Sequence, residues 1–176
     1  MPRLFVAIRP PAVVRQTLLG AMGGIEGARW QDEGQLHLTL AFVGEAEGAR
    51  TNDLVEALAE VQSAPFRAEI AGVGHFERYS LPTAVWAKVP LSDPLSQLQR
   101  RVERACRRAG LETERRAYRP HITLARLKRT AGPIGGWLVE HGTLRAGPWD
   151  VAGFTLFESL LRAGGSLYVP LVDYEF

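Results

Sequence analysis

The chain has 176 residues, of which 46% are hydrophobic and 23% are charged, and its formal net charge is +2 at pH 7. This length and composition are those of one compact globular domain. No apolar run is long enough to span a bilayer, and the single cysteine, Cys106, excludes an intramolecular disulfide framework. The apolar stretch near the N-terminus is too short for a signal peptide, so we expect a cytoplasmic protein.

The first half of the chain predicts an alternation of strands and helices. Apolar and β-branched runs indicate the strands, and the spacing of apolar residues indicates the helices. Pro10 and Pro11 end the first strand, and Gly44 ends the second. In chain order, the expected elements are a strand at 4–8, a helix at 12–22, a strand at 36–43, a helix at 50–61 and a strand at 66–73.

The second half repeats this order. A strand at 84–89 ends at Pro90, and a strongly amphipathic helix over 94–109 stops at Gly110. The elements expected after it are a strand at 121–127, a glycine-rich segment, a strand at 151–157 and a final strand at 166–173.

The two halves can be superposed by sequence, and neither is long enough to be stable alone. The matching segments are 6–10 with 86–90, 37–41 with 121–125, and 70–73 with 151–154. We therefore predict one α+β domain over residues 1–176, built from two pseudo-twofold lobes at about residues 1–80 and 81–176. Whether the C-terminal strand returns to the first lobe is left open.

A His-x-Thr-Leu tetrapeptide occurs on one predicted strand of each half, at His37 and at His121. Since strand side chains alternate between faces, His37 shares one face with Thr39 and Ala41. The opposite face is expected to point to the core and holds Leu36, Leu38, Leu40 and Phe42. The second strand follows the same pattern, with a polar face formed by His121, Thr123 and Ala125.

Two histidines that face each other across a cleft suit acid–base catalysis near neutral pH, because an unperturbed imidazole has a pKa of about 6.5. One can take a proton from water while the other protonates the departing ribose oxygen of a cyclic phosphodiester. The hydroxyls of Thr39 and Thr123 can donate hydrogen bonds to phosphoryl oxygens. This scheme needs no metal and no cofactor, and two histidines without further ligands are a poor zinc site. The other two histidines, His75 and His141, are expected to be structural or solvent-exposed.

Basic residues crowd into residues 100–129, a distribution that suits a phosphate-bearing partner. The alternative is that the first part of this cluster is simply the solvated face of a helix. The cluster comprises Arg100, Arg101, Arg104, Arg107, Arg108, Arg115, Arg116, Arg119, Arg126, Lys128 and Arg129.

Together with the strand at 4–8 and its prolines, both tetrapeptides and their flanks resemble the two-histidine (2H) phosphoesterase superfamily. Within it, the sequence is similar to the bacterial RNA 2′,3′-cyclic phosphodiesterases, historically called 2′-5′ RNA ligases. The resembling segments are 4–8, 36–44, 119–126, 154–159 and 168–171. The resemblance implies a bilobal fold in which antiparallel sheets line a central cleft and helices lie outside.

The resemblance also implies an activity, which is metal-independent hydrolysis of RNA 2′,3′-cyclic phosphate ends to 2′-phosphates, with reversible 2′-5′ RNA ligase activity as an addition. The expected partner is RNA with such ends, with no membrane and no obligate protein partner, so that we expect a monomer. Two alternatives stay open: a phosphodiesterase that acts on small cyclic nucleotides, and a non-catalytic module that binds RNA or nucleotides.

The resemblance assigns catalysis to the two motif histidines and phosphate binding to Thr39, Thr123 and Arg126. We favour His37 as general acid and His121 as general base, although the symmetry of the motifs leaves the order open. Strand alternation alone places Arg126 on the face opposite His121, so its role requires that the strand ends or bulges near Ala125. The candidates for contacting the RNA bases are Tyr118, Arg119 and Phe5.

Overall fold

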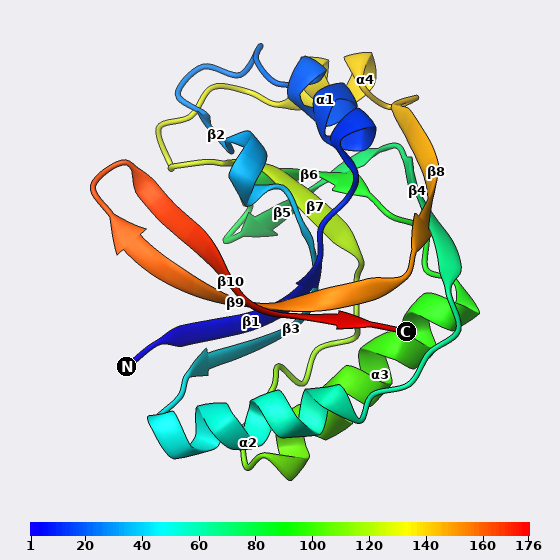
Figure 1. The fold of residues 1–176 in the computed structure, drawn as a ribbon. Coiled ribbons are helices and arrows are strands. Elements are labelled where there is room, and N and C mark those ends of the chain that lie inside the picture. The colour runs from blue at the N-terminus through cyan, green and yellow to red at the C-terminus, as the bar shows by residue number, and fades with distance from the viewer.

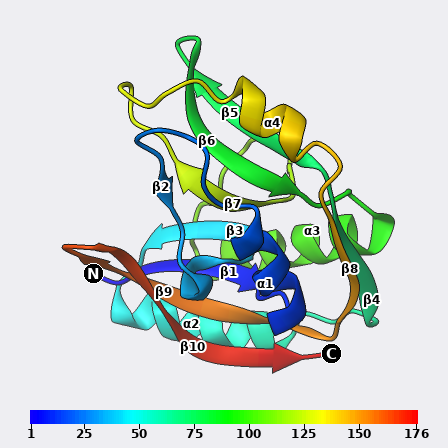
Figure 2. The ribbon, with the colours of Figure 1, turned by 90° about the horizontal axis from the view of Figure 1, so that it is seen from above.

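Two four-stranded antiparallel sheets face each other in the computed structural model, which describes residues 1–176 (Figures 1 and 2). The first sheet has the order β10 (Gly165–Glu175), β9 (Gly153–Arg162), β1 (Arg3–Ile8), β3 (Leu38–Glu45). The second sheet has the order β2 (Arg29–Trp30), β7 (His121–Arg126), β6 (Leu81–Lys88), β5 (Val73–Arg78). The expected α+β class with antiparallel sheets is confirmed.

A third, two-stranded sheet carries the chain between the other two. It pairs β4 (Phe66–Ala71) with β8 (Arg145–Val151). Beyond Gly72, which has a φ of +95°, β4 leads into β5 of the second sheet, and β8 leads into β9 of the first. The expected strand over 66–73 is therefore divided in two at Gly72.

This crossing means that the sheets do not divide the chain at a boundary near residue 80. Strand β5 lies with β6 and β7, whereas β9 and β10 lie with β1 and β3. The C-terminal strand thus returns to the sheet that contains the N-terminal one (Figure 1). The physical reason is that β4 and β8 each carry their half of the chain into the opposite sheet.

Four α-helices accompany the sheets: α1 (Ala12–Gly20), α2 (Gly48–Ala59), α3 (Asp93–Arg108) and α4 (Gly135–Glu140). Helices α2 and α3 pack against each other beneath the first sheet (Figure 1), and α1 packs against β8. The short α4 and the strand β8 lie between residues 127 and 151, where the sequence predicted only a glycine-rich segment. None of the helices combines the length and the apolar character that a membrane crossing needs.

Helix α3 shows why the expected helix at 94–109 was correct to within one residue. The Ser92 hydroxyl accepts a hydrogen bond from the Leu95 N–H, and Pro94 follows in the first turn. Arg107 and Arg108 lie in the last turn, where cations are favoured by the helix dipole. Gly110, with a φ of +78°, ends the helix.

The first strand is buried on both faces, which explains its unbroken apolar sequence. Leu4, Val6 and Ile8 belong to the main hydrophobic core, which takes residues from both sheets and from the helices. Phe5 and Ala7 point the other way and form a small separate cluster with Phe157. This second cluster lies on the side of the first sheet that faces the second sheet.

Truncation of a core side chain on α3 tests this packing. Leu98 is fully buried, so Leu98→Ala should lower the free energy of unfolding by about 2–5 kcal/mol. Leu161 is 86% exposed, and Leu161→Ala should change the free energy of unfolding by less than about 0.5 kcal/mol. Urea unfolding of both variants measures the difference, and equal effects would contradict the described core.

Candidate active site

Each His-x-Thr strand contains a β-bulge at the leucine that ends its tetrapeptide, which is Leu40 in the first motif and Leu124 in the second. In β3 the pairing with β1 skips Leu40, and in β7 the pairing with β6 skips Leu124. Because the extra residue interrupts the alternation of faces, Leu40 and Ala41 are both buried, and so are Leu124 and Ala125. The side chains after each bulge therefore point to the face opposite the one that simple alternation predicts.

The two bulges decide the positions of Phe42 and Arg126. Phe42 is 49% exposed, so the prediction that it lies in the core is wrong. Ala125 is fully buried and does not line the cavity, so its prediction for the polar face is also wrong, whereas Ala41 is buried but still borders the cavity. For Arg126, the required bulge is present near Ala125, and the side chain lies on the same face as His121. Phe42 and Arg126 occupy equivalent positions in the two motifs.

The strand pairing also corrects the sequence superposition by one residue. Val6 pairs with Ala41, and Val85 pairs with Ala125. The structural equivalent of Val6 is therefore Val85 and not Trp86. The bulges are common to both halves, so they leave the equivalence of the two tetrapeptides intact.

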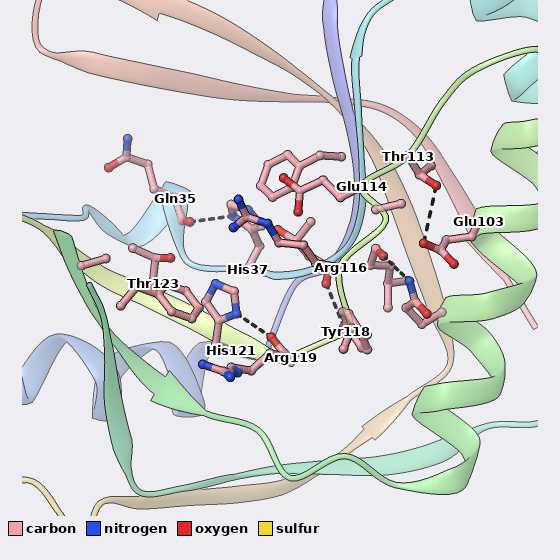
Figure 3. Close-up of a pocket in the computed structure, with 18 of the residues that line it drawn as sticks. Gln35, His37, Glu103, Thr113, Glu114, Arg116, Tyr118, Arg119, His121 and Thr123 are labelled. Atoms are coloured by element: carbon pink, nitrogen blue, oxygen red, sulfur yellow. Dashed lines mark hydrogen bonds between the residues drawn. The ribbon is translucent and has the colours of Figure 1, made fainter. Parts of the chain in front are cut away.

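One cavity of about 630 Å³ collects every residue that sequence analysis assigned to catalysis or phosphate binding. These residues are His37, Thr39, His121, Thr123 and Arg126. His121 and Thr123 lie on β7 of the second sheet, and His37 directly precedes β3 of the first sheet (Figure 3). Each of the two facing sheets therefore contributes one His-x-Thr pair to the cavity.

Both imidazoles are held in the same way. His37 Nδ1 lies 2.7 Å from the carbonyl oxygen of Gln35, and His121 Nδ1 lies 2.7 Å from that of Arg119 (Figure 3). A carbonyl can only accept a hydrogen bond, so each Nδ1 carries a proton. In the neutral ring Nε2 is then the basic nitrogen, and no hydrogen bond from the protein occupies it. Each ring can thus accept or donate a proton at Nε2.

Aromatic rings support each imidazole. His37 lies against Phe5 and makes an edge contact with Tyr168, with ring centroids 4.8 and 4.9 Å apart. His121 makes an edge contact with Phe76 at 4.9 Å and lies 5.6 Å from Trp86. These contacts restrict rotation of the two rings and place them in apolar surroundings.

Burial lowers the pKa of both histidines, because it disfavours the charged imidazole. The pKa of His37 falls to about 4, because burial has the largest effect and outweighs the hydrogen bond to Gln35, which raises the pKa. The positive charges of His121 and Arg126 lower it further. The pKa of His121 is lowered by burial and by Arg126 and Arg119. Repulsion between the two imidazolium charges favours states in which only one ring carries the extra proton.

The structure changes the interpretation of two candidates for base contact. Phe5 is 3% exposed and lies beneath His37, so its ring is not free to stack on a base. The hydroxyl of Tyr118 donates a hydrogen bond to the Thr39 carbonyl at 2.8 Å, which ties the segment before β7 to the first motif (Figure 3). Burial raises the pKa of Tyr118 well above its usual range. The third candidate, Arg119, is exposed, lines the cavity and lies 5.8 Å above the Phe76 ring.

The basic cluster is divided between two places. Arg116, Arg119 and Arg126 line the cavity. On α3, Arg108 lies 3.7 Å from Glu60 and Arg101 donates to a carbonyl of the segment after α2. The helical part of the cluster is therefore a solvated face that contacts α2 and its flank, as the alternative expected. His75, which pairs with Glu77, and His141 lie outside the cavity.

Sequence comparison places the chain in a known family. A family model described as the 2′-5′ RNA ligase superfamily matches residues 25–158. The chain belongs to the 2′-5′ RNA ligase superfamily. Within it, the chain is 33% identical to a Thermus thermophilus protein named RNA 2′,3′-cyclic phosphodiesterase, over 98% of this chain and 89% of the relative. An Aeropyrum pernix protein of the same name is 32% identical over 82% of this chain and 84% of its own length.

Solved structures of similar proteins share the fold. The crystal structure of TT0787 of Thermus thermophilus superposes with a TM-score of 0.83 at 27% identity, covering 98% of this chain and 97% of that one. The crystal structure of E. coli LigT complexed with 3′-AMP superposes with a TM-score of 0.79 at 25% identity, covering 100% of this chain and 99% of LigT. The resemblance stated from the two motifs is thereby confirmed.

Most of the remaining cavity wall could not be predicted from the sequence, because its residues come from elements without a motif. The only sequence signal lies two residues before each motif histidine, where Gln35 and Arg119 supply the carbonyls that orient the rings. The lining residues that were not predicted include Gln31, Phe76, Gln99, Glu103, Thr113, Glu114 and Tyr168.

Removal of the Arg126 charge tests the electrostatics of the cavity. Because this charge lowers the pKa of both His37 and His121, Arg126→Gln should raise both values. NMR titration of the imidazole carbon and nitrogen shifts measures the change. Arg129→Gln removes an exposed charge outside the cavity and should leave both values unchanged. Unaltered titration of His37 in Arg126→Gln would contradict the described arrangement.

Proposed function

We propose that this protein is an RNA 2′,3′-cyclic phosphodiesterase that hydrolyses cyclic-phosphate RNA ends to 2′-phosphates. The observation that carries the proposal is the symmetric pair of imidazoles in one cavity, each with Nδ1 bound to a carbonyl and Nε2 unoccupied. The names of the relatives in Thermus thermophilus and Aeropyrum pernix support the same substrate class.

In the proposed reaction, His121 takes a proton from a water molecule, whose oxygen attacks phosphorus in line with the bond to the ribose O3′. That bond breaks, and His37 donates its proton to O3′, which leaves a 3′-hydroxyl and a 2′-phosphate. After one turnover His121 is charged and His37 is neutral, so proton exchange with solvent restores the starting state. Each transfer contributes about 10²–10⁴-fold to the rate.

The phosphoryl oxygens would be bound by Thr39, Thr123 and Arg126, which lie in the same cavity. Hydroxyl and guanidinium donors stabilise the charge that these oxygens gain in the transition state. Metal independence is part of the proposal, because the two imidazoles and these donors together supply the proton transfers and the charge stabilisation that the reaction needs.

A 5′-hydroxyl that replaces water in this reaction would form a 2′-5′ phosphodiester, so 2′-5′ RNA ligase activity belongs to the same proposal. RNA ends are favoured over small cyclic nucleotides because the cavity extends beyond the motif residues and is bordered by Arg116, Arg119 and the exposed ring of Phe42. A cytoplasmic location and a monomeric state remain predictions.

Replacement of either histidine tests the proposal. With an oligonucleotide that ends in a 2′,3′-cyclic phosphate, His37→Ala and His121→Ala should each lower kcat at least about 100-fold, since each removes one proton transfer. The product of the wild-type protein should carry a 2′-phosphate, and EDTA should not change its rate. His75→Ala is the matched control outside the cavity and should retain full activity. A loss of less than about tenfold in both cavity variants would exclude this mechanism.

The lowered pKa values predict the pH dependence. The base must be neutral and the acid charged, so activity falls as pH drops below the pKa of the base or rises above that of the acid. Because both pKa values in the free protein are lowered, kcat/KM should be maximal below about pH 6.5 and fall as pH rises. A bound phosphodiester anion favours the charged imidazoles, so the optimum of kcat should lie at higher pH. A kcat/KM maximum at about pH 8 would contradict the described charge arrangement.

A further inference from the structure

The end of the cavity next to α3 differs chemically from the part that holds the histidines. We call it the α3 end and define it by Gln99 and Glu103 of α3 and by Thr113 of the segment that follows. Figure 3 shows Glu103 and Thr113 beside the helix, on the side of the cavity away from His121. Carboxylates repel phosphate oxygens, so this end does not extend the phosphate site. It offers hydrogen-bond acceptors instead.

Gln99 supplies an acceptor that is open to the cavity. The residue is 7% exposed and lines the cavity. Its Nε2 donates a hydrogen bond to the Leu40 carbonyl at 3.4 Å, which fixes the orientation of the amide. The Oε1 on the other side of the amide has no hydrogen-bond partner in the protein. Unlike Trp86 Nε1 and Trp149 Nε1, this oxygen is not closed off from solvent, so it can accept a hydrogen bond from water or from a ligand in the cavity.

Glu103 supplies a second acceptor that is held in place. Its side chain is 18% exposed, and Oε1 lies 3.5 Å from the Thr113 hydroxyl. The other oxygen, Oε2, lies 3.7 Å from Arg107, whose side chain is 61% exposed. A carboxylate has about four lone-pair positions, so these two contacts leave it able to accept further hydrogen bonds.

On the basis of the proposed function, we propose that the α3 end is a base-reading subsite, in which Gln99 and Glu103 accept hydrogen bonds from the edge of an RNA base. A site made of acceptors selects bases by their donors. Guanine presents N1–H and N2–H side by side and can bind a carboxylate through both. Adenine and cytosine each present one amino group, whereas uracil presents a single N–H between two carbonyls that a carboxylate repels.

The expected order is therefore guanine first, adenine and cytosine next, and uracil last. The base can belong to the nucleotide that carries the cyclic phosphate or to the one before it, since both place the same chemistry in the cavity. Two series of dinucleotides that end in a 2′,3′-cyclic phosphate distinguish these positions. In each series the base is varied at one position, and the nucleotide at the other position remains uridine.

The first measurement is kcat/KM on both series. Guanine should exceed uracil by about tenfold or more at one of the two positions, which is the discrimination that a bidentate contact provides. Glu103→Gln loses the paired acceptors and should reduce the ratio of kcat/KM for guanine to that for uracil to less than about threefold. The matched control is Glu112→Gln, which removes an exposed charge from the same segment outside the main cavity and should keep the preference.

The second measurement is equilibrium binding of guanosine and uridine dinucleotides that carry a 2′-phosphate, by calorimetry. It reports base preference without turnover, so it separates this inference from the proposed function. Preference in binding without any turnover would overturn the activity and support the subsite. If turnover is normal but the guanine-to-uracil ratios of both kcat/KM and binding affinity stay below about threefold at both positions, the subsite alone is overturned.

A second variant guards against a purely structural effect of Glu103. Gln99→Met keeps the length of the side chain but removes its amide oxygen, and it should also reduce the preference for guanine. Thermal unfolding shows whether each variant is folded. Two folded variants that both keep the wild-type preference would contradict the proposed subsite.

Discussion

Two leucines that the strand pairing skips, Leu40 and Leu124, determine what faces the cavity. Without the bulges, strict alternation would point Arg126 away from His121 and bury Phe42 in the core. With them, each motif presents a histidine, a threonine and a third side chain to the same space. The positions of Phe42 and Arg126 depend on this change of face, and with Arg126 comes the positive charge that lowers the pKa of both imidazoles.

The second constraint is the way in which the imidazoles are held. A carbonyl two residues upstream fixes the proton on Nδ1, and aromatic rings restrict the plane of each ring. Burial and the neighbouring positive charges then lower both pKa values, most clearly that of His37. An anionic phosphodiester would reverse part of this effect. The cavity is thus prepared to gain a proton when an anion binds, which is what acid–base chemistry on a cyclic phosphate needs.

Symmetry and asymmetry are combined in this cavity. The motifs, their bulges and their hydrogen bonds are repeated, but the equivalent positions after the bulge carry Phe42 in one half and Arg126 in the other. Helix α3 and the segment after it add Gln99 and Glu103 to one end only. The repeated features suit the two proton transfers of the proposed reaction, and the differences suit the recognition of one end of an asymmetric substrate.

Periodic patterns and the duplicated tetrapeptide were sufficient to predict the α+β class, most elements and the four motif side chains that meet in the cavity. They could do so because apolar periodicity and helix signals such as Gly110 act locally. The sequence did not determine that Phe42 is exposed, that Phe5 is covered by His37, or that β5, β9 and β10 join the sheets that they do. Those features depend on strand register, on the crossing of β4 and β8 and on packing between distant segments, which only the tertiary structure decides.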